Sequence, residues 1–172
     1  LAGMSEESSA HAEQFLREMG VNILLNKRVV DYRDHKVVLE DGTEIATRTF
    51  IWVSGVTGVT IGNLDASLIG RGGRIKVDSF NRVEGMNNVF AIGDQCIQLA
   101  DENYPNGHPQ LAQVAIQQGE LLAKNLVRME KGREMKPFHY RNLGSMATVG
   151  RNRAVAEFSK VKMQGWFAWV MW

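Results

Sequence analysis

Apolar positions in the first third of the chain change from a helical period to short continuous runs. Between Ser5 and Met19 they recur every three to four residues, which predicts a helix with Ser5 as its N-cap and Gly20 at its end. Residues 21–25, which are apolar except for Asn22, predict a buried strand. Three short strands separated by tight turns then predict an antiparallel meander: residues 29–32, 36–39 and 44–46.

A second apolar run, residues 50–53, contains no polar side chain and ends near Gly55. Such a run is typical of a strand that is covered on both faces of a sheet. The following residues, 56–88, are rich in glycine and irregular, apart from an alternating strand over residues 74–77. We place a crossing between two domains near residues 56–60.

The remaining pattern predicts a strand, a long helix and a final pair of strands. The strand covers residues 89–92 and stops at Gly93, and after a polar loop the helix runs from Gln110 to about Glu130. Two more strands follow: residues 145–149 and 154–158. This order of elements indicates an α/β fold.

The junction between the 89–92 strand and the long helix has the chemistry of a ligand-binding turn. Gly93 has no side chain, so a ligand can come close to the backbone there. Asp94 can accept hydrogen bonds from hydroxyl groups, and the helix that begins near Gln110 points its unpaired N–H groups into the same crevice.

Two motifs at this junction resemble those of the two-dinucleotide-domain flavoproteins. Residues 91–94, Ala-Ile-Gly-Asp, are similar to a segment shared by many FAD reductases of the pyridine nucleotide-disulfide reductase superfamily. Residues 112–117, Ala-Gln-Val-Ala-Ile-Gln, match the narrower A-Q-x-A-x-Q pattern of the type II NADH dehydrogenases, the single-chain NADH:quinone oxidoreductases. The resemblance covers the whole chain, as the carboxy-terminal part of a longer enzyme.

The resemblance implies incomplete pieces of two dinucleotide-binding, Rossmann-like domains with a small antiparallel β meander. Residues 1–56 would be the tail of an NADH-binding domain, residues 57–163 the carboxy-terminal part of an FAD-binding domain with the quinone-site helix, and residues 164–172 the start of a membrane-anchoring segment. No G-x-G-x-x-G fingerprint occurs in the sequence, and a dinucleotide site needs that turn for its pyrophosphate. We therefore expect this chain by itself to bind FAD weakly or not at all and to be inactive.

By the same resemblance, a hydride would pass from NADH through FAD to a quinone, in a respiratory-chain enzyme that does not pump protons. Gln113 and Gln117 share one helical face and would position the quinone. The FAD would be bound by residues on both sides of the polar loop and on a later strand: Gly93, Asp94, Leu111, Ala112, Gln113 and Met146.

These residues also have simpler interpretations. The helix rich in alanine and glutamine can be an ordinary packed helix, Asp94 can cap a turn, and Met146 can be a core residue. Many family members carry a lysine where Leu143 stands, which weakens any stabilisation of charge from that side. His108 can relay protons at the lip of the pocket or be a loop histidine without a role.

The amino-acid composition excludes some of the alternative functions. A hydrophobic content of 44% and a charged content of 23% are ordinary for a globular protein. The single cysteine, Cys96, excludes an internal disulfide and a CxxC redox pair, which argues against a disulfide reductase of the same superfamily. The histidines show no metal-ligand spacing, so no metal site is predicted. Another FAD-dependent pyridine nucleotide reductase is an alternative.

The charge is unevenly distributed along the chain. Residues 1–123 hold ten Lys/Arg and sixteen Asp/Glu, a net charge of −6, whereas residues 124–172 hold ten and three, a net charge of +7. The basic end closes with the apolar residues 165–172, which include three tryptophans and are far shorter than the roughly 20 residues that span a bilayer. Four cations precede them: Arg151, Arg153, Lys160 and Lys162.

This basic, tryptophan-rich end predicts contact with an anionic membrane surface. We expect a peripheral protein on the cytoplasmic face of the cell membrane, and we expect self-association through uncovered apolar surface. Alternatives are a terminal helix that packs on the core, and a non-catalytic membrane-docking or interaction module. Nucleic-acid binding is not predicted, because no recognised module accompanies the positive charge.

Overall fold

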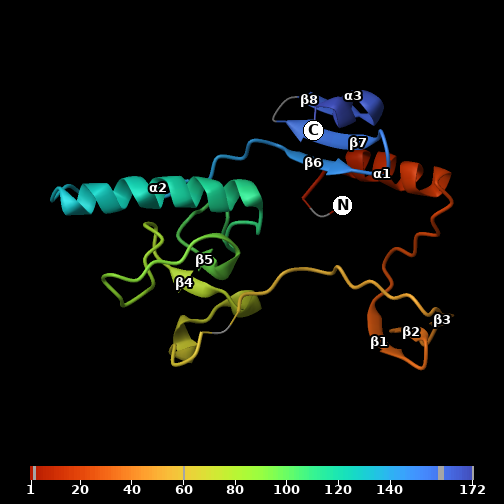
Figure 1. Cartoon of the computed structure of the whole chain (residues 1–172), viewed down its shortest axis with the longest axis horizontal. Coiled ribbons are helices and arrows are strands. Elements are labelled where there is room, and N and C mark those ends of the chain that lie inside the picture. Colours follow the sequence, from red (N-terminus) through yellow and green to blue (C-terminus); the bar gives the residue numbers. More distant parts are fainter. Residues whose placement is uncertain (2, 60, 159–160, 172) are drawn as a thin grey trace. The chain divides into compact units, whose positions relative to one another are not determined.

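The computed structural model describes residues 1, 3–59, 61–158 and 161–171 and has a mixed α/β fold (Figure 1). The chain forms two compact units. One unit combines Leu1–Val53 with Leu143–Trp172, and the other is Ser54–Asn142. The range 57–163 that we expected for an FAD-binding domain therefore includes residues of both units, and the assignment of domains to NADH and FAD stays a prediction.

The amino-terminal helix of the first unit is confirmed as α1 (Glu6–Glu18). Ser5 is its N-cap and its side chain accepts a hydrogen bond from the backbone N–H of Ser8, as the N-cap position requires. Glu6 and Glu7 lie in the first turn, where a carboxylate interacts favourably with the helix dipole. The helix ends before Gly20, which has a positive φ of 80°.

The predicted meander is also confirmed. Its strands are β1 (Val29–Arg33), β2 (Lys36–Leu39) and β3 (Glu44–Ala46), and they pair antiparallel in that order. Val37 and Leu39 of the central strand β2 are buried.

A second antiparallel sheet in this unit contains β6 (Ser145–Thr148), β7 (Ala154–Phe158) and β8 (Val161–Gln164), and it leads into α3 (Gly165–Val170). The central strand β7 has alternate residues on its two faces. Val155 packs with Ala12 of α1, whereas Ala154 and Ala156 pack with Ala168 of α3. The two helices thus contact opposite faces of the sheet, and the predicted strands 145–149 and 154–158 are confirmed.

Two predicted buried strands of this unit are wrong. Residues 21–25 and 50–53 pair with no strand among the described residues, and Ile51 and Val53 are 76% and 87% exposed. Apolar composition alone does not make a strand, because each strand needs a neighbour for its backbone hydrogen bonds. Phe50 instead stacks on Tyr32 of β1, with ring centroids 4.8 Å apart.

The second unit is built around a pair of parallel strands, β4 (Ile75–Val77) and β5 (Cys96–Gln98). Its apolar core contains Ile75, Val77, Val83 and Cys96. Short 3₁₀ turns connect the elements: η1 (Ala66–Leu68), η2 (Arg71–Gly73) and η3 (Gly93–Gln95). The predicted strand 74–77 is confirmed as β4, but the strand predicted over residues 89–92 is wrong, because β4 pairs with the residues after Asp94 and Phe90 makes only an isolated bridge.

The long predicted helix is α2 (Ala112–Glu130), which begins two residues later than expected. Residues 134–141, which we call the α2-bound segment, are connected to it by side-chain to backbone hydrogen bonds. Asn125 donates to the carbonyl of Lys136 and accepts from its N–H, at 2.8 and 2.9 Å. Arg128 donates to the carbonyl of Glu134.

Candidate functional site

The centre of the predicted site is the η3 turn, which lies directly against α2. Gly93 opens the turn with a φ of 65°, a left-handed conformation that glycine adopts without strain. A Cβ atom built on Gly93 would lie 3.3 Å from Cβ of Ala115. The backbone of the turn therefore approaches α2 closely, and a side chain at position 93 would be both strained and crowded.

Hydrogen bonds from α2 and from Gln110, two residues before it, fix this turn. The N–H of Gly93 donates to Oε1 of Gln118 at 2.7 Å, and Nε2 of Gln110 donates to the carbonyl of Asp94 at 3.1 Å. The carboxylate of Asp94 is exposed and makes no hydrogen bond to the described residues. It is thus available to accept hydrogen bonds from a ligand.

The start of α2 completes the candidate site. Leu111 is the N-cap residue and supplies no side-chain hydrogen bond, and Leu111 and Ala112 are exposed. Gln113 follows in the first turn and is half-buried. A helix start carries a partial positive charge of about 0.5 e and favours an anion or a carbonyl oxygen. The structure therefore brings together five of the predicted residues: Gly93, Asp94, Leu111, Ala112 and Gln113.

The other glutamine predicted to position a quinone, Gln117, has a structural partner. Its Nε2 donates to the carbonyl of Arg141 at 2.9 Å, and its Oε1 accepts from the N–H of Arg141 at 3.0 Å. Gln117 also lines a hollow between α2 and the α2-bound segment, together with Leu121 and Phe138. Its amide thus replaces the backbone pairing that a neighbouring strand would give to Arg141.

The last predicted residue, Met146, belongs to the other unit. There it is half-buried and packs against the cluster of Ala154, Ala156 and Ala168. This is the packing of a core methionine, and its contact with a cofactor stays a prediction.

His108 is buried in the loop before α2. Its Nε2 lies 2.9 Å from Oδ2 of Asp101, and this hydrogen bond lowers the pKa of the Asp101 carboxyl. The ring also packs edge-on against Phe138, while its Nδ1 has no hydrogen-bond partner among the described residues. With 2% of the residue exposed, its visible role is to hold the loop.

Two residues that the sequence analysis missed contribute to the geometry of the site. Gln118 is 1% exposed and follows Val114 by four residues, so helical spacing places both on the buried face of α2. Arg74 is buried as well, and its guanidinium donates to the carbonyls of Cys96 and His108 at 2.6 and 3.1 Å. Arg74 thus ties β5 to the loop before α2.

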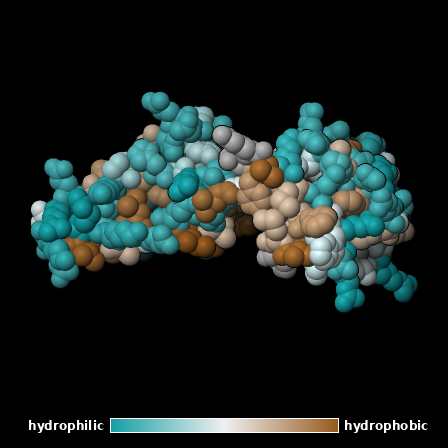
Figure 2. All heavy atoms as spheres, turned by 90° about the horizontal axis from the view of Figure 1, so that it is seen from above, coloured by the Kyte–Doolittle hydropathy of each residue, from teal (hydrophilic) through white to brown (hydrophobic). Residues whose placement is uncertain are grey.

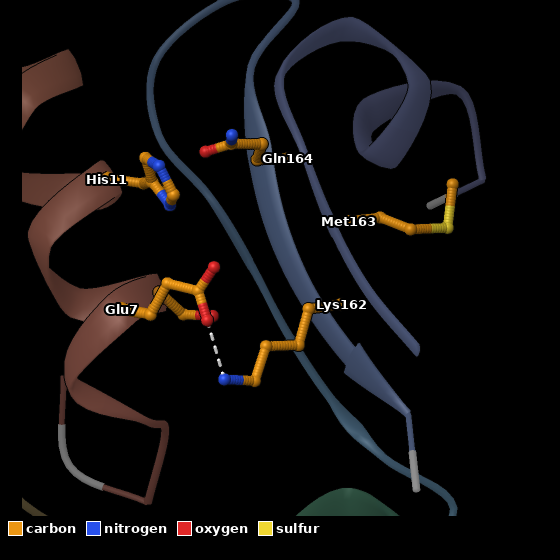
Figure 3. Close-up of a pocket in the computed structure, with 6 residues that line it drawn as sticks. Glu7, His11, Lys162, Met163 and Gln164 are labelled. Carbon is orange, nitrogen blue, oxygen red and sulfur yellow. Dashed lines mark hydrogen bonds and ion pairs between the residues drawn. The ribbon is translucent and has the colours of Figure 1, made fainter. Parts of the chain in front are cut away.

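A different hollow lies in the first unit, between α1 and β8 (Figure 3). It is lined by Glu7, Ser8, His11, Lys162, Met163 and Gln164. Figure 3 shows Nζ of Lys162 directed at the carboxylate of Glu7, at 2.7 Å. The hydrogen bond from Lys162 lowers the pKa of Glu7, and the two charges compensate each other. None of the predicted site residues lines this hollow.

The carboxy-terminal segment has one packed face and one exposed face. Ala168 is fully buried and Trp169 packs beside it, whereas Trp166 and Phe167 are 56% and 70% exposed. Of the predicted lipid-binding cations, Arg153 pairs with Glu18 and Lys162 with Glu7; Lys160 and Trp172 lie outside the described residues. Within the described ranges, no helix has the length and apolarity to cross a membrane.

Residues 1–119 match the family model described as pyridine nucleotide-disulphide oxidoreductase. The whole chain is 35% identical to the type II NADH:quinone oxidoreductase NdhA of Mycobacterium tuberculosis and spans 38% of that protein. It is 33% identical to the internal alternative NAD(P)H-ubiquinone oxidoreductase A1 of Arabidopsis thaliana mitochondria and spans 37% of it. Its fold is similar, with a TM-score of 0.79 over 98% of the chain at 17% identity, to half of the NDH2 chain from Plasmodium falciparum whose structure was determined with NADH.

Proposed function

The chain belongs to the pyridine nucleotide-disulphide oxidoreductase family, and from this membership we propose that it forms part of an FAD-dependent NADH:quinone oxidoreductase. The observation that supports this most directly is the η3 turn on the first turns of α2. It combines a glycine backbone, the exposed carboxylate of Asp94 and a helix start in one place.

The residues present fit a flavin. FAD, when bound, would supply the redox chemistry by which NADH, a proton and a quinone give NAD⁺ and a quinol. Asp94 accepts hydrogen bonds from ribityl hydroxyls, because its carboxylate is exposed and unpaired among the described residues. The helix start at Leu111 and Ala112 would stabilise negative charge on a bound flavin, and the Gln113 amide would orient a quinone carbonyl.

The domain assignment follows from the same proposal. Residues 1–56 are the tail of an NADH-binding domain and residues 57–163 the carboxy-terminal part of an FAD-binding domain. The family match over residues 1–119 supports this, since it includes both the meander and the η3 turn.

Flavin binding tests the function most directly. In the protein expressed from the complete reading frame, Asp94→Ala should lower the FAD content at least about tenfold, because charge-assisted hydrogen bonds to the cofactor are lost. Glu102→Ala is the matched control, since Glu102 is an exposed carboxylate in the loop before α2. Flavin absorbance after gel filtration gives the measurement, and an FAD content unchanged by Asp94→Ala contradicts the proposal.

Membrane contact is a second proposed function, favoured by the exposed face of α3. Trp166, Phe167, Val170 and Met171 are all more than half exposed, and such side chains enter the headgroup region of a bilayer. We place the protein at the cytoplasmic face of the cell membrane as a peripheral protein. In this role the chain docks on the lipid whether or not it takes part in catalysis.

Vesicle sedimentation distinguishes membrane docking through α3 from non-specific hydrophobic binding. Trp166→Ser with Phe167→Ser should reduce binding to vesicles that contain anionic lipid. Trp52→Ser is the matched control, because Trp52 is 57% exposed and Trp166 is 56% exposed. Equal losses in the two variants contradict a membrane role for α3.

A further inference from the structure

Gln118 has hydrogen-bonding contacts at both ends of the η3 turn. Its Oε1 accepts from the N–H of Gly93 at 2.7 Å, at the start of the turn. The same amide lies against Sγ of Cys96, the residue that follows the turn, at 3.7 Å from Oε1 and 3.6 Å from Nε2. Asp94 lies between these two ends, and its side chain is exposed.

The turn depends on this outside contact because it lacks a local one. The first N–H groups of any helical turn have no acceptor within the turn and need a capping side chain. Ile92, the N-cap residue of η3, has no side-chain oxygen and makes no capping hydrogen bond. Gln118, 25 positions after Gly93, supplies the acceptor.

Because Gln118 is buried, its hydrogen bond to Gly93 cannot be replaced by one to water. Gln118 is 1% exposed, so water does not replace its oxygen when the amide is removed, and an unsatisfied buried N–H group is costly. Burial also raises the pKa of the Cys96 thiol, which keeps the sulfur protonated and able to donate.

We propose that Gln118 is a positioning residue that holds the η3 turn at both ends, so that the carboxylate of Asp94 is directed to the hydroxyls of the cofactor. This inference rests on the proposed function. Gln118 itself does not touch the ligand; it acts through Gly93 and Cys96.

Amide hydrogen exchange tests the hydrogen bond between Gly93 and Gln118, first in the unsubstituted chain. In the unsubstituted chain the Gly93 amide should exchange slowly, although Gly93 belongs to no strand and to no α-helix. Gln118→Met keeps the length of the side chain and removes the acceptor, so Gly93 should lose its protection. Fast exchange at Gly93 in the unsubstituted chain overturns the proposal at once.

Cofactor affinity tests the consequence, in the protein expressed from the complete reading frame. Gln118→Met should raise the dissociation constant for FAD about tenfold, a loss of the size expected for one displaced hydrogen-bonding group. Asn125→Leu is the control, because Asn125 is also 1% exposed on α2 but binds the backbone of Lys136 instead. It should change FAD affinity less than about twofold while Lys136 loses its exchange protection.

The outcomes separate this inference from the proposed function. If the unsubstituted protein binds no FAD, the proposed function fails and the inference fails with it. If it binds FAD and Gln118→Met binds it equally tightly, only the inference is overturned. Equal losses of affinity in Gln118→Met and Asn125→Leu also overturn it, since a general loosening of α2 then explains both.

Discussion

Three glutamines of α2 occupy different positions in the candidate site and its surroundings. Gln113 lies in the first turn, Gln117 holds the backbone of Arg141, and Gln118 holds Gly93. Helical spacing correctly placed Gln113 and Gln117 on one side of the helix. It could not show that Gln117 pairs with a residue 24 positions away, because contacts between a side chain and a distant backbone leave no periodic pattern in a sequence.

Gln113 is the residue for which a kinetic prediction is sharpest. In the enzyme expressed from the complete reading frame, Gln113→Ala should raise the KM for the quinone more than the KM for NADH, because we propose that the amide orients the quinone and does not bind NADH. Ile116→Ala, at an exposed position of the same helix, should change neither constant. Steady-state kinetics with each substrate varied in turn gives both values, and equal increases would remove Gln113 from the quinone site.

Secondary-structure elements were predictable where their partners lie close in sequence. The meander β1–β3 formed as expected because its strands are joined by tight turns. The mainly apolar runs 21–25 and 50–53 have no such neighbours, and most of their side chains are exposed. β5 was not predicted because it contains the polar residue Gln98. The structure shows that the Gln98 side chain is buried and that its amide donates to the carbonyl of Asp78.

The contact between α1 and β7 should make the first unit sensitive to pH. Hydrogen bonds from Ser5 and Ser8 lower the pKa of Glu157 from 4.5. A carboxyl with a lowered folded-state pKa stabilises the fold above its unfolded pKa and loses this contribution as the pH falls through the folded value. Glu157→Gln should therefore reduce stability at neutral pH, and the difference from the unsubstituted chain should shrink below about pH 4.5.

Urea unfolding at neutral pH and at about pH 3 measures this difference. Glu157→Gln keeps one oxygen that can accept from both serines, but it replaces the second oxygen, which accepts from the N–H of Ser5, by an amide group. The pH dependence of the stability difference therefore reports the charge. Glu40→Gln, at an exposed position of the same unit, should have little effect at either pH. A difference between Glu157→Gln and the unsubstituted chain that does not depend on pH would rule out this linkage.

At the scale of the whole chain, the candidate site was more predictable than the units that carry it. The motifs at residues 91–94 and 112–117 predicted that Gly93 and Asp94 lie near the start of α2, whereas the contact from Gln118 that fixes the turn left no local signal in the sequence. The two units were not predictable, since residues 143–172 fold with residues 1–53 across a long separation in sequence. Long-range packing of this kind depends on shape and not on local pattern.

The sequence contains no G-x-G-x-x-G fingerprint, and from this we predict the behaviour of the 172-residue chain alone. Without a backbone turn for the pyrophosphate, we expect the site at η3 to hold only part of FAD. We expect the chain to bind FAD weakly or not at all and to show no NADH–quinone turnover. Flavin titration and quinone reduction assays measure both, and clear turnover by this chain would contradict the expectation.

Exposed apolar side chains should also make the chain self-associate. Figure 2 shows hydrophobic residues at the surface between hydrophilic ones. Ile51, Trp52 and Val53 are each more than half exposed. A contiguous apolar patch promotes association because its burial removes it from water. Light scattering should therefore report species larger than a monomer, and Ile51→Ser with Val53→Ser should shift them toward the monomer. Because these side chains make no buried core, the double variant should keep its stability. A monodisperse monomer for the unsubstituted chain would contradict this prediction.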